Sequence, residues 1–465
     1  MLALNTLTAL SPIDGRYGDR LCSLRPLWSE FALIKHRLII EIKWLITLAD
    51  HPDIAEIPPL SAPALEILEG LITHFSMADA ERVKAIEQIT NHDVKAIEYF
   101  LKEKLSAYPE LDLIKEFVHF ACTSEDINNL AYGLMLQSLQ QAQLLPAMAK
   151  VIQALDELAL TYAAQPMLSR THGQPATPTT MGKEMANFSA RLKKQSQAAE
   201  RVCVLGKFNG AVGNFNAHYV AYPNINWYET NQAFVEGLGL CWNAYTTQIE
   251  PHDYIADLFQ SLIHFNQILI DFNRDIWGYI SLGYFKQQAI NNEVGSSTMP
   301  HKINPIDFEN AEGNLGIANA LAQFLSQQLL TSRWQRDLVD STLMRTIGVV
   351  FAHTLLAYQN ILKGISKLSV DADRLNHELD ENWAVLAEPV QMVMRRYGIS
   401  EPYEKLKAFT RGKIIDKAAL HDFIDALTLP HCEKQALKHL TPATYLGLAT
   451  TLATHTRDQA SLRTV

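Results

Sequence analysis

The sequence predicts an all-α protein built around long helices, and two observations carry this prediction. The first is that proline is absent from three long stretches, between Pro178 and Pro223, between Pro251 and Pro300, and between Pro305 and Pro389. Helix interiors exclude proline because it lacks a backbone donor and its ring clashes with the preceding turn. No convincing series of alternating polar and apolar residues is visible, so strands are not expected to dominate.

The second observation is that apolar residues inside these stretches recur at helical spacing. One seam steps by four or three residues through Leu258, Leu262, Phe265, Leu269, Phe272, Ile276 and Tyr279. The same spacing occurs at Met148, Val151, Leu155, Leu158 and Tyr162, and again at Leu315, Ala318, Ala322, Leu325 and Leu329. A seam with this period is typical of long helices packed side by side.

The chain has 465 residues, more than one compact core usually contains. We expect an N-terminal helical domain over residues 1–112, a central long-helix bundle over residues 113–366 and a C-terminal helical domain over residues 367–465. A bundle of long helices that is apolar on more than one face usually continues into a partner subunit. The sequence therefore also predicts a homo-oligomer.

Composition excludes several classes of protein. Apolar residues make up 48% of the chain and charged residues 19%, as in globular rather than disordered proteins. A net charge of −10 without any Lys/Arg-rich run disfavours a nucleic-acid binder. No basic region precedes an apolar run at the N-terminus, and the most apolar stretch, residues 347–358, is too short to span a bilayer.

Cysteine usage favours a cytoplasmic protein. The five cysteines are an odd number and contain no Cys-x-x-Cys pair; they are Cys22, Cys122, Cys203, Cys241 and Cys432. This pattern favours reduced thiols over a disulfide framework or a zinc site.

A polar loop at residues 295–305 interrupts the helical pattern. It reads Gly-Ser-Ser-Thr-Met-Pro-His-Lys-Ile-Asn-Pro, and it places the hydroxyls of Ser296 and Ser297 near Lys302 and Asn304 in the sequence. Glycine and serine make a loop mobile, and proline cannot continue a helix. A hydroxyl beside a cation offers a nucleophile or a base, although an ordinary flexible connector would have a similar composition.

A second polar segment, residues 169–178, reads Ser-Arg-Thr-His-Gly-Gln-Pro-Ala-Thr-Pro. Its histidine, His172, precedes a glycine and is expected on an irregular bend that solvent can reach. Histidine is the side chain best suited to proton transfer near neutral pH, although a loop histidine can also be an ordinary surface residue. His264 and His353 lie inside helical patterns and are interpreted as packed or surface groups.

Two further segments are typical of helix starts. Thr123 and Ser124 precede two acidic residues, and Thr-Asn-His-Asp at residues 90–93 precedes apolar residues at helical spacing. A capping residue followed by acids in the first turn explains both segments structurally. Helix N-termini also attract anions, so ligand binding at both places stays open.

Arginines in two other segments are candidates for binding phosphate or carboxylate. Residues 332–337, Ser-Arg-Trp-Gln-Arg-Asp, contain Arg336 and lead to Ser341 and Arg345. A Pro- and Gly-containing loop near the N-terminus places Arg16 beside Tyr17. The alternative interpretation of Arg336 and Arg345 is a solvated helix face.

Residues 295–305 resemble the signature loop of the fumarase/aspartase superfamily, Gly-Ser-Ser-x-Met-Pro-x-Lys-x-Asn-Pro, with every fixed position matched. The segments that look like those of adenylosuccinate lyases are residues 16–17, 91–93, 123–124, 169–175, 246–251 and 332–337. The resemblance covers nearly the whole chain and is closest to the longer bacterial type. It implies three helical domains, a homotetramer whose central helices form one bundle, and active sites that each draw loops from three subunits.

The resemblance also implies the reaction. Adenylosuccinate lyases release fumarate by β-elimination from adenylosuccinate, giving AMP, and from succinylaminoimidazole carboxamide ribotide, giving AICAR, in purine nucleotide biosynthesis. No metal or organic cofactor is implied, and no clustered metal-ligand pattern is visible. A cytoplasmic enzyme acting on small molecules, without nucleic-acid or membrane partners, is expected.

By resemblance, Ser296 is the catalytic base, His172 is the catalytic acid, and Lys302 and Asn304 receive the substrate carboxylate. The residues that resemble further substrate contacts are Arg16, Tyr17, Asn91, His92, Asp93, Thr123, Ser124, Gln248, Arg336, Ser341 and Arg345. Some relatives have arginine where Asn91 and Asn310 stand, so the phosphate contacts stay open.

Two alternatives remain at this point. Argininosuccinate lyase, fumarase, aspartase and the carboxymuconate cycloisomerases share the signature loop, but the segments around Arg16 and Arg336 favour a phosphorylated nucleotide. A non-catalytic structural helical protein is the other alternative, and the intact Ser296, His172 and Lys302 disfavour it.

Overall fold

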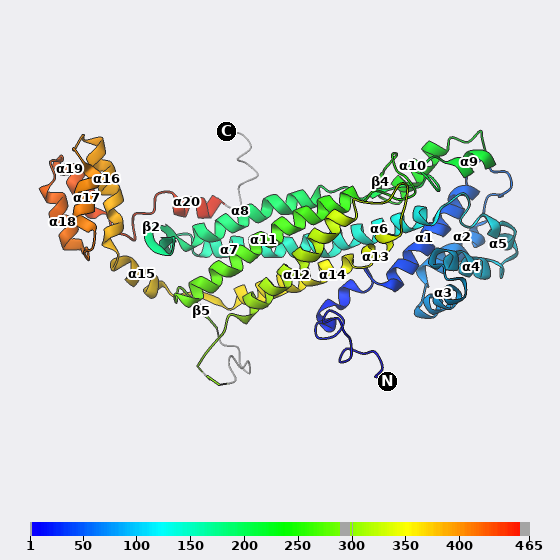
Figure 1. Ribbon diagram of the computed structural model, residues 1–465, viewed down its shortest axis with the longest axis horizontal. Coiled ribbons are helices and arrows are strands. Elements are labelled where there is room, and N and C mark those ends of the chain that lie inside the picture. The colour runs from blue at the N-terminus through cyan, green and yellow to red at the C-terminus, as the bar shows by residue number, and fades with distance from the viewer. Residues whose placement is uncertain (1, 289–297, 300, 456–465) are drawn as a thin grey trace. The chain divides into compact units, whose positions relative to one another are not determined.

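The computed structural model describes residues 2–288, 298–299 and 301–455. It confirms the predicted all-α class (Figure 1). The first elements are η1 (Gly18–Leu24), α1 (Glu30–Ala49), α2 (Ala62–Thr73), α3 (Met77–Thr90), α4 (Asp93–Leu105), α5 (Pro109–Ile114) and η2 (Lys115–Phe117).

The long helices follow. They are α6 (Ser124–Leu139), which continues through the π-helical segment η3 (Gln140–Leu144) into α7 (Leu145–Thr161), then α8 (Met181–Glu200), α11 (Asp253–Ser281), α12 (Ile306–Gln328) and α14 (Ile347–Ser366). Shorter helices between them are α9 (Asn216–Ala221), α10 (Trp227–Gly237) and α13 (Val339–Met344). The last elements are α15 (Ala372–Asp380), η4 (Trp383–Leu386), α16 (Ala387–Arg396), α17 (Pro402–Thr410), α18 (Lys417–Ala426), α19 (His431–His439) and α20 (Ala449–Thr454).

Strands are short and occur in pairs within the described residues. The antiparallel pairs are β1 (Pro166–Thr171) with β2 (Gln174–Thr180), and β5 (Phe285–Gln287) with β6 (Leu368–Val370). The parallel pair is β3 (Leu205–Gly206) with β4 (Cys241–Trp242).

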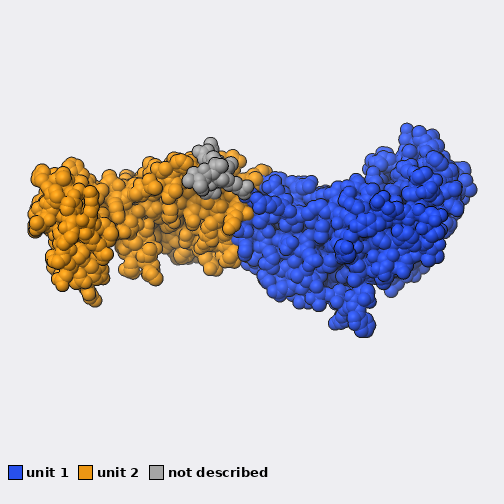
Figure 2. All heavy atoms as spheres, turned by 90° about the horizontal axis from the view of Figure 1, so that it is seen from above, with its two compact units in different colours: residues 1–147, 195–266, 314–357 blue, residues 148–194, 267–313, 358–465 orange. Residues whose placement is uncertain are grey.

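The chain forms two compact units, each built from three stretches of sequence (Figure 2). Unit 1 comprises residues 1–147, 195–266 and 314–357, and unit 2 comprises residues 148–194, 267–313 and 358–465. The division into three domains along the sequence stays a prediction. In unit 2, the helices from η4 to α19 have an apolar core of their own, which includes Trp383, Met394 and Ile424.

The predicted seam on α11 is confirmed as a buried face. Its residues from Leu258 to Ile276 have no solvent exposure. Within unit 1, Phe259 of α11 packs on Phe351 of α14 with ring centroids 6.0 Å apart. Within unit 2, Phe272 contacts an aromatic ring of α8 and another of α12. The heptad-like spacing therefore marks the line along which the long helices pack.

Cysteine pairing differs from the expectation that all five thiols are reduced. Cys203 and Cys241 form a disulfide, with Cα atoms 6.4 Å apart, a normal separation for this bond. The pairing arises because β3 and β4 lie side by side: the Cys241 N–H donates to the Val204 carbonyl over 2.9 Å. Spacing in the sequence gave no sign of this contact.

Among the described residues, no helix combines the length and the apolar character needed to cross a lipid bilayer.

The close approach of α7 and α8 in unit 2 yields a prediction for stability. A Cβ atom on Gly182 would lie 2.3 Å from the Ala159 carbonyl oxygen and 2.6 Å from the Ala163 Cα, so the backbones would have to separate. We expect Gly182→Ala to lower the free energy of unfolding by about 1–3 kcal/mol, the usual effect of overpacking. Denaturant titration measures the difference.

Gly237→Ala is the matched control, because no described atom lies within 4 Å of a Cβ at that position. Its free energy of unfolding should stay the same or rise slightly. Equal losses in the two variants would contradict the packing argument.

Candidate functional site

A fully buried ion pair lies at the centre of the site in unit 1. The Lys207 Nζ is 3.0 Å from the Asp126 Oδ1, and both side chains are 0% exposed. Asp126 also accepts the backbone N–H groups of Thr123 at 2.8 Å and Gly210 at 3.1 Å. Lys207 donates to the carbonyl oxygens of Gly210 at 2.9 Å and Gln248 at 2.7 Å. Because oxygen partners surround the three N–H groups of the ammonium, its burial is compensated, and three separate segments are fixed together.

A chain of charged and amide groups runs from this centre across the start of α6. Arg336 bonds Glu125 at 2.8 Å, and Asn128 donates to the same Glu125 oxygen at 2.7 Å. Asn128 in turn accepts from the Arg37 Nε at 2.8 Å, and the Arg37 Nη2 donates to Asp93 at 2.7 Å. The network thus joins α1, α4, α6 and the segment before α13.

Arg345 completes the network at its other end. Its guanidinium donates to the Asp93 Oδ2 at 3.3 Å, to the Ser341 carbonyl at 2.7 Å and to the Ser341 hydroxyl at 3.0 Å. Burial alone would raise the pKa of Asp93, but the charges of Arg37 and Arg345 outweigh it and hold that pKa below its ordinary value. Asp93 is therefore ionised at neutral pH and counters both arginines.

Arg336 and Arg345 differ in exposure. The side chain of Arg336 is 17% exposed and that of Arg345 is 40% exposed. Neither is a freely solvated cation, since each has a carboxylate partner. The solvated-face interpretation therefore does not describe Arg336.

Both predicted helix starts are confirmed, and both lie beside this network. Asn91, in the left-handed conformation with φ 52°, ends α3, and His92 caps α4 by accepting the Lys95 N–H on its Nδ1 at 3.1 Å. Thr123 precedes Ser124, the first residue of α6. Helix N-termini carry partial positive charge and unpaired N–H groups, so both suit an anion.

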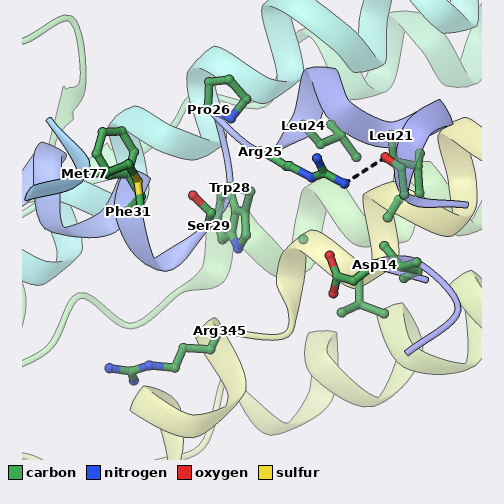
Figure 3. Close-up of a pocket in the computed structure, with 15 residues that line it drawn as sticks. Asp14, Leu21, Leu24, Arg25, Pro26, Trp28, Ser29, Phe31, Met77 and Arg345 are labelled. Carbon is green, nitrogen blue, oxygen red and sulfur yellow. Dashed lines mark hydrogen bonds between the residues drawn. The ribbon is translucent and has the colours of Figure 1, made fainter. Parts of the chain in front are cut away.

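Arg16 lies on the exposed loop before η1, with its guanidinium 5.9 Å from the centre of the Tyr17 ring. Near this loop, a cavity of about 610 Å³ is lined mainly by apolar side chains such as Trp28 and Phe31, with Asp14 and Arg345 at its border (Figure 3). Arg345 thus belongs both to the charged network and to the wall of an apolar cavity.

His172 belongs to unit 2 and lies at the tip of the β1–β2 hairpin. The strands pair up to Thr171 and Gln174, which leaves His172 and Gly173 as the two turn residues, with φ values of 53° and 74°. Positive φ at both turn positions is the type I′ geometry, which follows the twist of the strands. The expected bend is therefore a regular hairpin turn, and His172 is exposed on it.

The hairpin is anchored close to its tip. Arg170 on β1 and Tyr284 both bond the carboxylate of Glu378 on α15. These contacts within unit 2 fix the strand that leads to His172.

Ser296 lies outside the described residues. Of the other signature-loop candidates, both in unit 2, Lys302 is exposed and its N–H donates to the Met299 carbonyl at 3.1 Å, while Asn304 is half-buried. The structure thus brings together Asp93, Arg336, Ser341 and Arg345 in unit 1, with Asn91, His92, Thr123, Ser124 and Gln248 on the adjoining segments.

Sequence reasoning missed the residues that hold these candidates in place. Arg37 could have been noticed, because its spacing from Leu33 and Ile34 places it on the buried apolar face of α1. Lys207 and Asn128 carry no such signal, since the contacts that join them to other segments, to Gln248 and Arg37, lie far away in the sequence. Within the described part of the chain, no group of three or more His, Cys, Asp or Glu side chains is arranged to hold a metal ion.

The buried pair yields a prediction for stability. Lys207→Met removes the ammonium and leaves the Asp126 carboxylate buried without its counter-charge. We expect the free energy of unfolding to fall by about 3–5 kcal/mol, as for other broken buried pairs. Chemical denaturation measures the loss.

Arg82→Met is the control, because it removes an arginine from the exposed Arg82–Glu103 pair. Exposed pairs contribute little, so its stability should stay close to that of the wild type. A small loss for Lys207→Met would show that the pair does not organise the site.

Known proteins similar to this chain share both its sequence and its fold. Residues 15–319 match the sequence model of a family described as Lyase, and residues 332–446 match that of the adenylosuccinate lyase C-terminal region. An adenylosuccinate lyase of Escherichia coli (strain K12) is 56% identical over 451 residues, which are 97% of this chain and 99% of the relative. One from Vibrio cholerae serotype O1 is 58% identical over 449 residues, 96% of this chain and 98% of the relative.

A crystal structure of 3-carboxy-cis,cis-muconate lactonizing enzyme from Pseudomonas putida has the same fold. It superposes with a TM-score of 0.74 at 20% identity, covering 94% of this chain and 96% of that chain. The family models and the extent of identity together place this chain in the adenylosuccinate lyase family.

Proposed function

We propose that this chain catalyses the β-elimination of fumarate from adenylosuccinate, giving AMP, and from succinylaminoimidazole carboxamide ribotide, giving AICAR. Two observations together support the proposal. The chain is 56–58% identical to adenylosuccinate lyases over nearly its whole length, and it has a network of arginines at two helix N-termini. Such a network suits a substrate that has a phosphate and two carboxylates. The enzyme would act in the cytoplasm, in purine nucleotide biosynthesis.

In this proposal the network in unit 1 binds the nucleotide. Arg336 and Arg345 bind phosphate, with Ser341 beside them and Arg16 and Tyr17 closing over the ligand. Asn91, His92 and Asp93 border the site at the start of α4, and Thr123, Ser124 and Gln248 contact the succinyl part. Support comes from the Asp126–Lys207 pair, which fixes both the start of α6 and the Gln248 carbonyl.

The chemical step requires a base, an acid and a place for negative charge. Ser296 removes the proton beside a substrate carboxylate, and the resulting carbanion is held as an aci-carboxylate by Lys302 and Asn304. His172 protonates the departing nitrogen. The exposed hairpin tip suits that role, because it places an imidazole where a ligand can reach it. The proposed reaction uses no metal or organic cofactor.

Substitutions of the proposed base and acid test this function through the absorbance of released fumarate. Wild type should cleave adenylosuccinate, and Ser296→Ala should lower turnover far more than tenfold, since tenfold is only about 1.4 kcal/mol of barrier. His172→Asn should lower kcat far more than it raises KM. Asparagine tolerates the left-handed conformation, so the turn is kept.

Ser297→Ala is the matched control, one residue along the same loop, and should have the milder effect. No cleavage of adenylosuccinate by the wild type would overturn the function. Near-normal turnover in Ser296→Ala would overturn the assignment of the base, and an intact kcat with a raised KM would make His172 a binding residue.

We also propose a homotetramer in which α12 contributes to the interface. One face of α12 is buried, through Leu315, Ala318, Ala322 and Leu325. A second face presents Gly313, Ile317, Ala320 and Phe324 to solvent at helical spacing. Small residues beside exposed apolar ones allow close approach of another helix, so a partner subunit explains the second face.

Ile317→Lys tests this interface. A charge on that face should dissociate the assembly, because the ammonium would lose its hydration without a partner. Analytical ultracentrifugation reports the mass. Gln323→Lys adds the same charge at the edge of the exposed surface of α12, about 120° around the helix from Ile317, and should leave the assembly intact. An unchanged mass for Ile317→Lys would exclude this face from the interface.

A further inference from the structure

His252 occupies an unusual position between two carboxylates in unit 1. It is only 2% exposed, and its backbone has a φ of 65°, in the left-handed region. Its Nδ1 is 3.7 Å from the Glu250 Oε2, and its Nε2 is 3.7 Å from the Asp340 Oδ2. These separations exceed hydrogen-bond length, and neither ring nitrogen has a hydrogen-bond partner within the described residues.

This arrangement is unfavourable in two respects. A left-handed backbone is uncommon outside glycine, and a buried nitrogen without a partner costs about 1–3 kcal/mol. Strain of this kind persists where the surrounding structure imposes it, often at functional sites. The imidazole is therefore placed where only a short movement would give it a hydrogen bond.

One side of His252 is rigid. Glu250 is fully buried, and its two oxygens already accept the His252 N–H at 2.7 Å and the Asn243 amide at 2.8 Å. Burial raises the pKa of Glu250. The Glu250 carboxylate is thus held in place by these two hydrogen bonds.

The other side of His252 faces Asp340, a carboxylate that also lies near Arg336. The Asp340 Oδ1 accepts the Ser341 N–H at 2.7 Å and lies 3.8 Å from the Arg336 Nη2, while Oδ2 faces His252. The Arg336 Nη1 is held by Glu125 at 2.8 Å. Asp340 therefore stands between Arg336 and His252 and is closely bonded to neither.

We propose that His252 is a positioning residue for Arg336. When Arg336 binds the phosphate of the substrate, the His252 imidazole forms a hydrogen bond to Asp340. This inference rests on the proposed function, in which Arg336 is a phosphate contact. As Arg336 turns to the ligand, Asp340 loses its nearby counter-charge, and the imidazole closes the 3.7 Å gap and donates to it. The carboxylate then no longer competes with phosphate for the guanidinium.

The position of His252 also couples two segments of the site. His252 follows Gln248 on one segment, and the Gln248 N–H donates to the Gln335 carbonyl at 3.4 Å, next to Arg336. A bond between His252 and Asp340 would add a second link between these segments. Binding of the succinyl end of the substrate would then be coupled to binding of its phosphate end.

The test compares a ligand with phosphate and one without it. We would measure KM and kcat for adenylosuccinate, and the inhibition constant of succinyladenosine, which lacks the phosphate. His252→Asn keeps the left-handed backbone tolerable and removes the imidazole. It should raise KM for adenylosuccinate about tenfold, or about 1.4 kcal/mol, with little change in kcat or in the inhibition constant of succinyladenosine.

His353→Gln is the control, because His353 is a buried imidazole of the same unit, bonded to Asn314 at 2.8 Å. His353→Gln should leave unchanged the ratio between the KM of adenylosuccinate and the inhibition constant of succinyladenosine. If His252→Asn does not fold, as judged by its thermal transition, His252→Gly relieves the left-handed strain and permits the same measurement.

A double-mutant cycle separates positioning from simple structural support. If His252 acts by restraining Asp340, then His252→Asn should have no further effect on KM in an Asp340→Asn background. Additive effects of the two substitutions on KM would overturn the inference. So would an equal weakening of adenylosuccinate binding and succinyladenosine binding by His252→Asn.

Arg336→Ala shows which proposal has failed. A wild type that does not cleave adenylosuccinate, or an Arg336→Ala variant with unchanged KM, overturns the function or the phosphate assignment, and the inference with it. If the function and the phosphate assignment both hold, but the His252 variants weaken the two ligands equally, then the inference alone is wrong.

Discussion

The site in unit 1 depends on one buried carboxylate and one buried ammonium, Asp126 and Lys207. Two charges removed from water are tolerated only when other polar groups replace their hydration, and here backbone N–H and carbonyl groups do so. The polypeptide itself therefore solvates the pair. Because those groups come from the start of α6, the turn at Gly210 and the segment at Gln248, none of the three can move without exposing a charge to an apolar interior.

Much of the fold could be predicted because its signals are local. The α11 seam follows the period of the helix, and the starts of α4 and α6 follow from capping residues at His92 and Thr123. Such patterns are determined by neighbours within one or two turns. The candidates in the signature loop were different: there, resemblance to a family supplied roles that the composition of the loop alone could not.

Other features could not be predicted because they depend on residues distant in the sequence. Arg37 bonds Asp93 across 56 positions, and Arg345 bonds Asp93 across 252. The Cys203–Cys241 disulfide follows from the pairing of two strands of two residues each, too short to show an alternating pattern. The hairpin around His172 was expected as an irregular bend, since His-Gly is not among the commonest sequences for its turn.

The matching of each arginine with a carboxylate has a consequence for how ligands arrive. Arg336 faces Glu125, Arg345 faces Asp93, and the whole chain has a net charge of −10. The site therefore projects little positive potential into solution, and long-range steering of an anion toward it is weak. In the proposed function, the nucleotide and the chain are both anionic, so added salt should screen their repulsion and should not slow association. Under the same proposal, recognition would begin only at contact, when the ligand replaces Glu125 at Arg336 and Asp93 at Arg345.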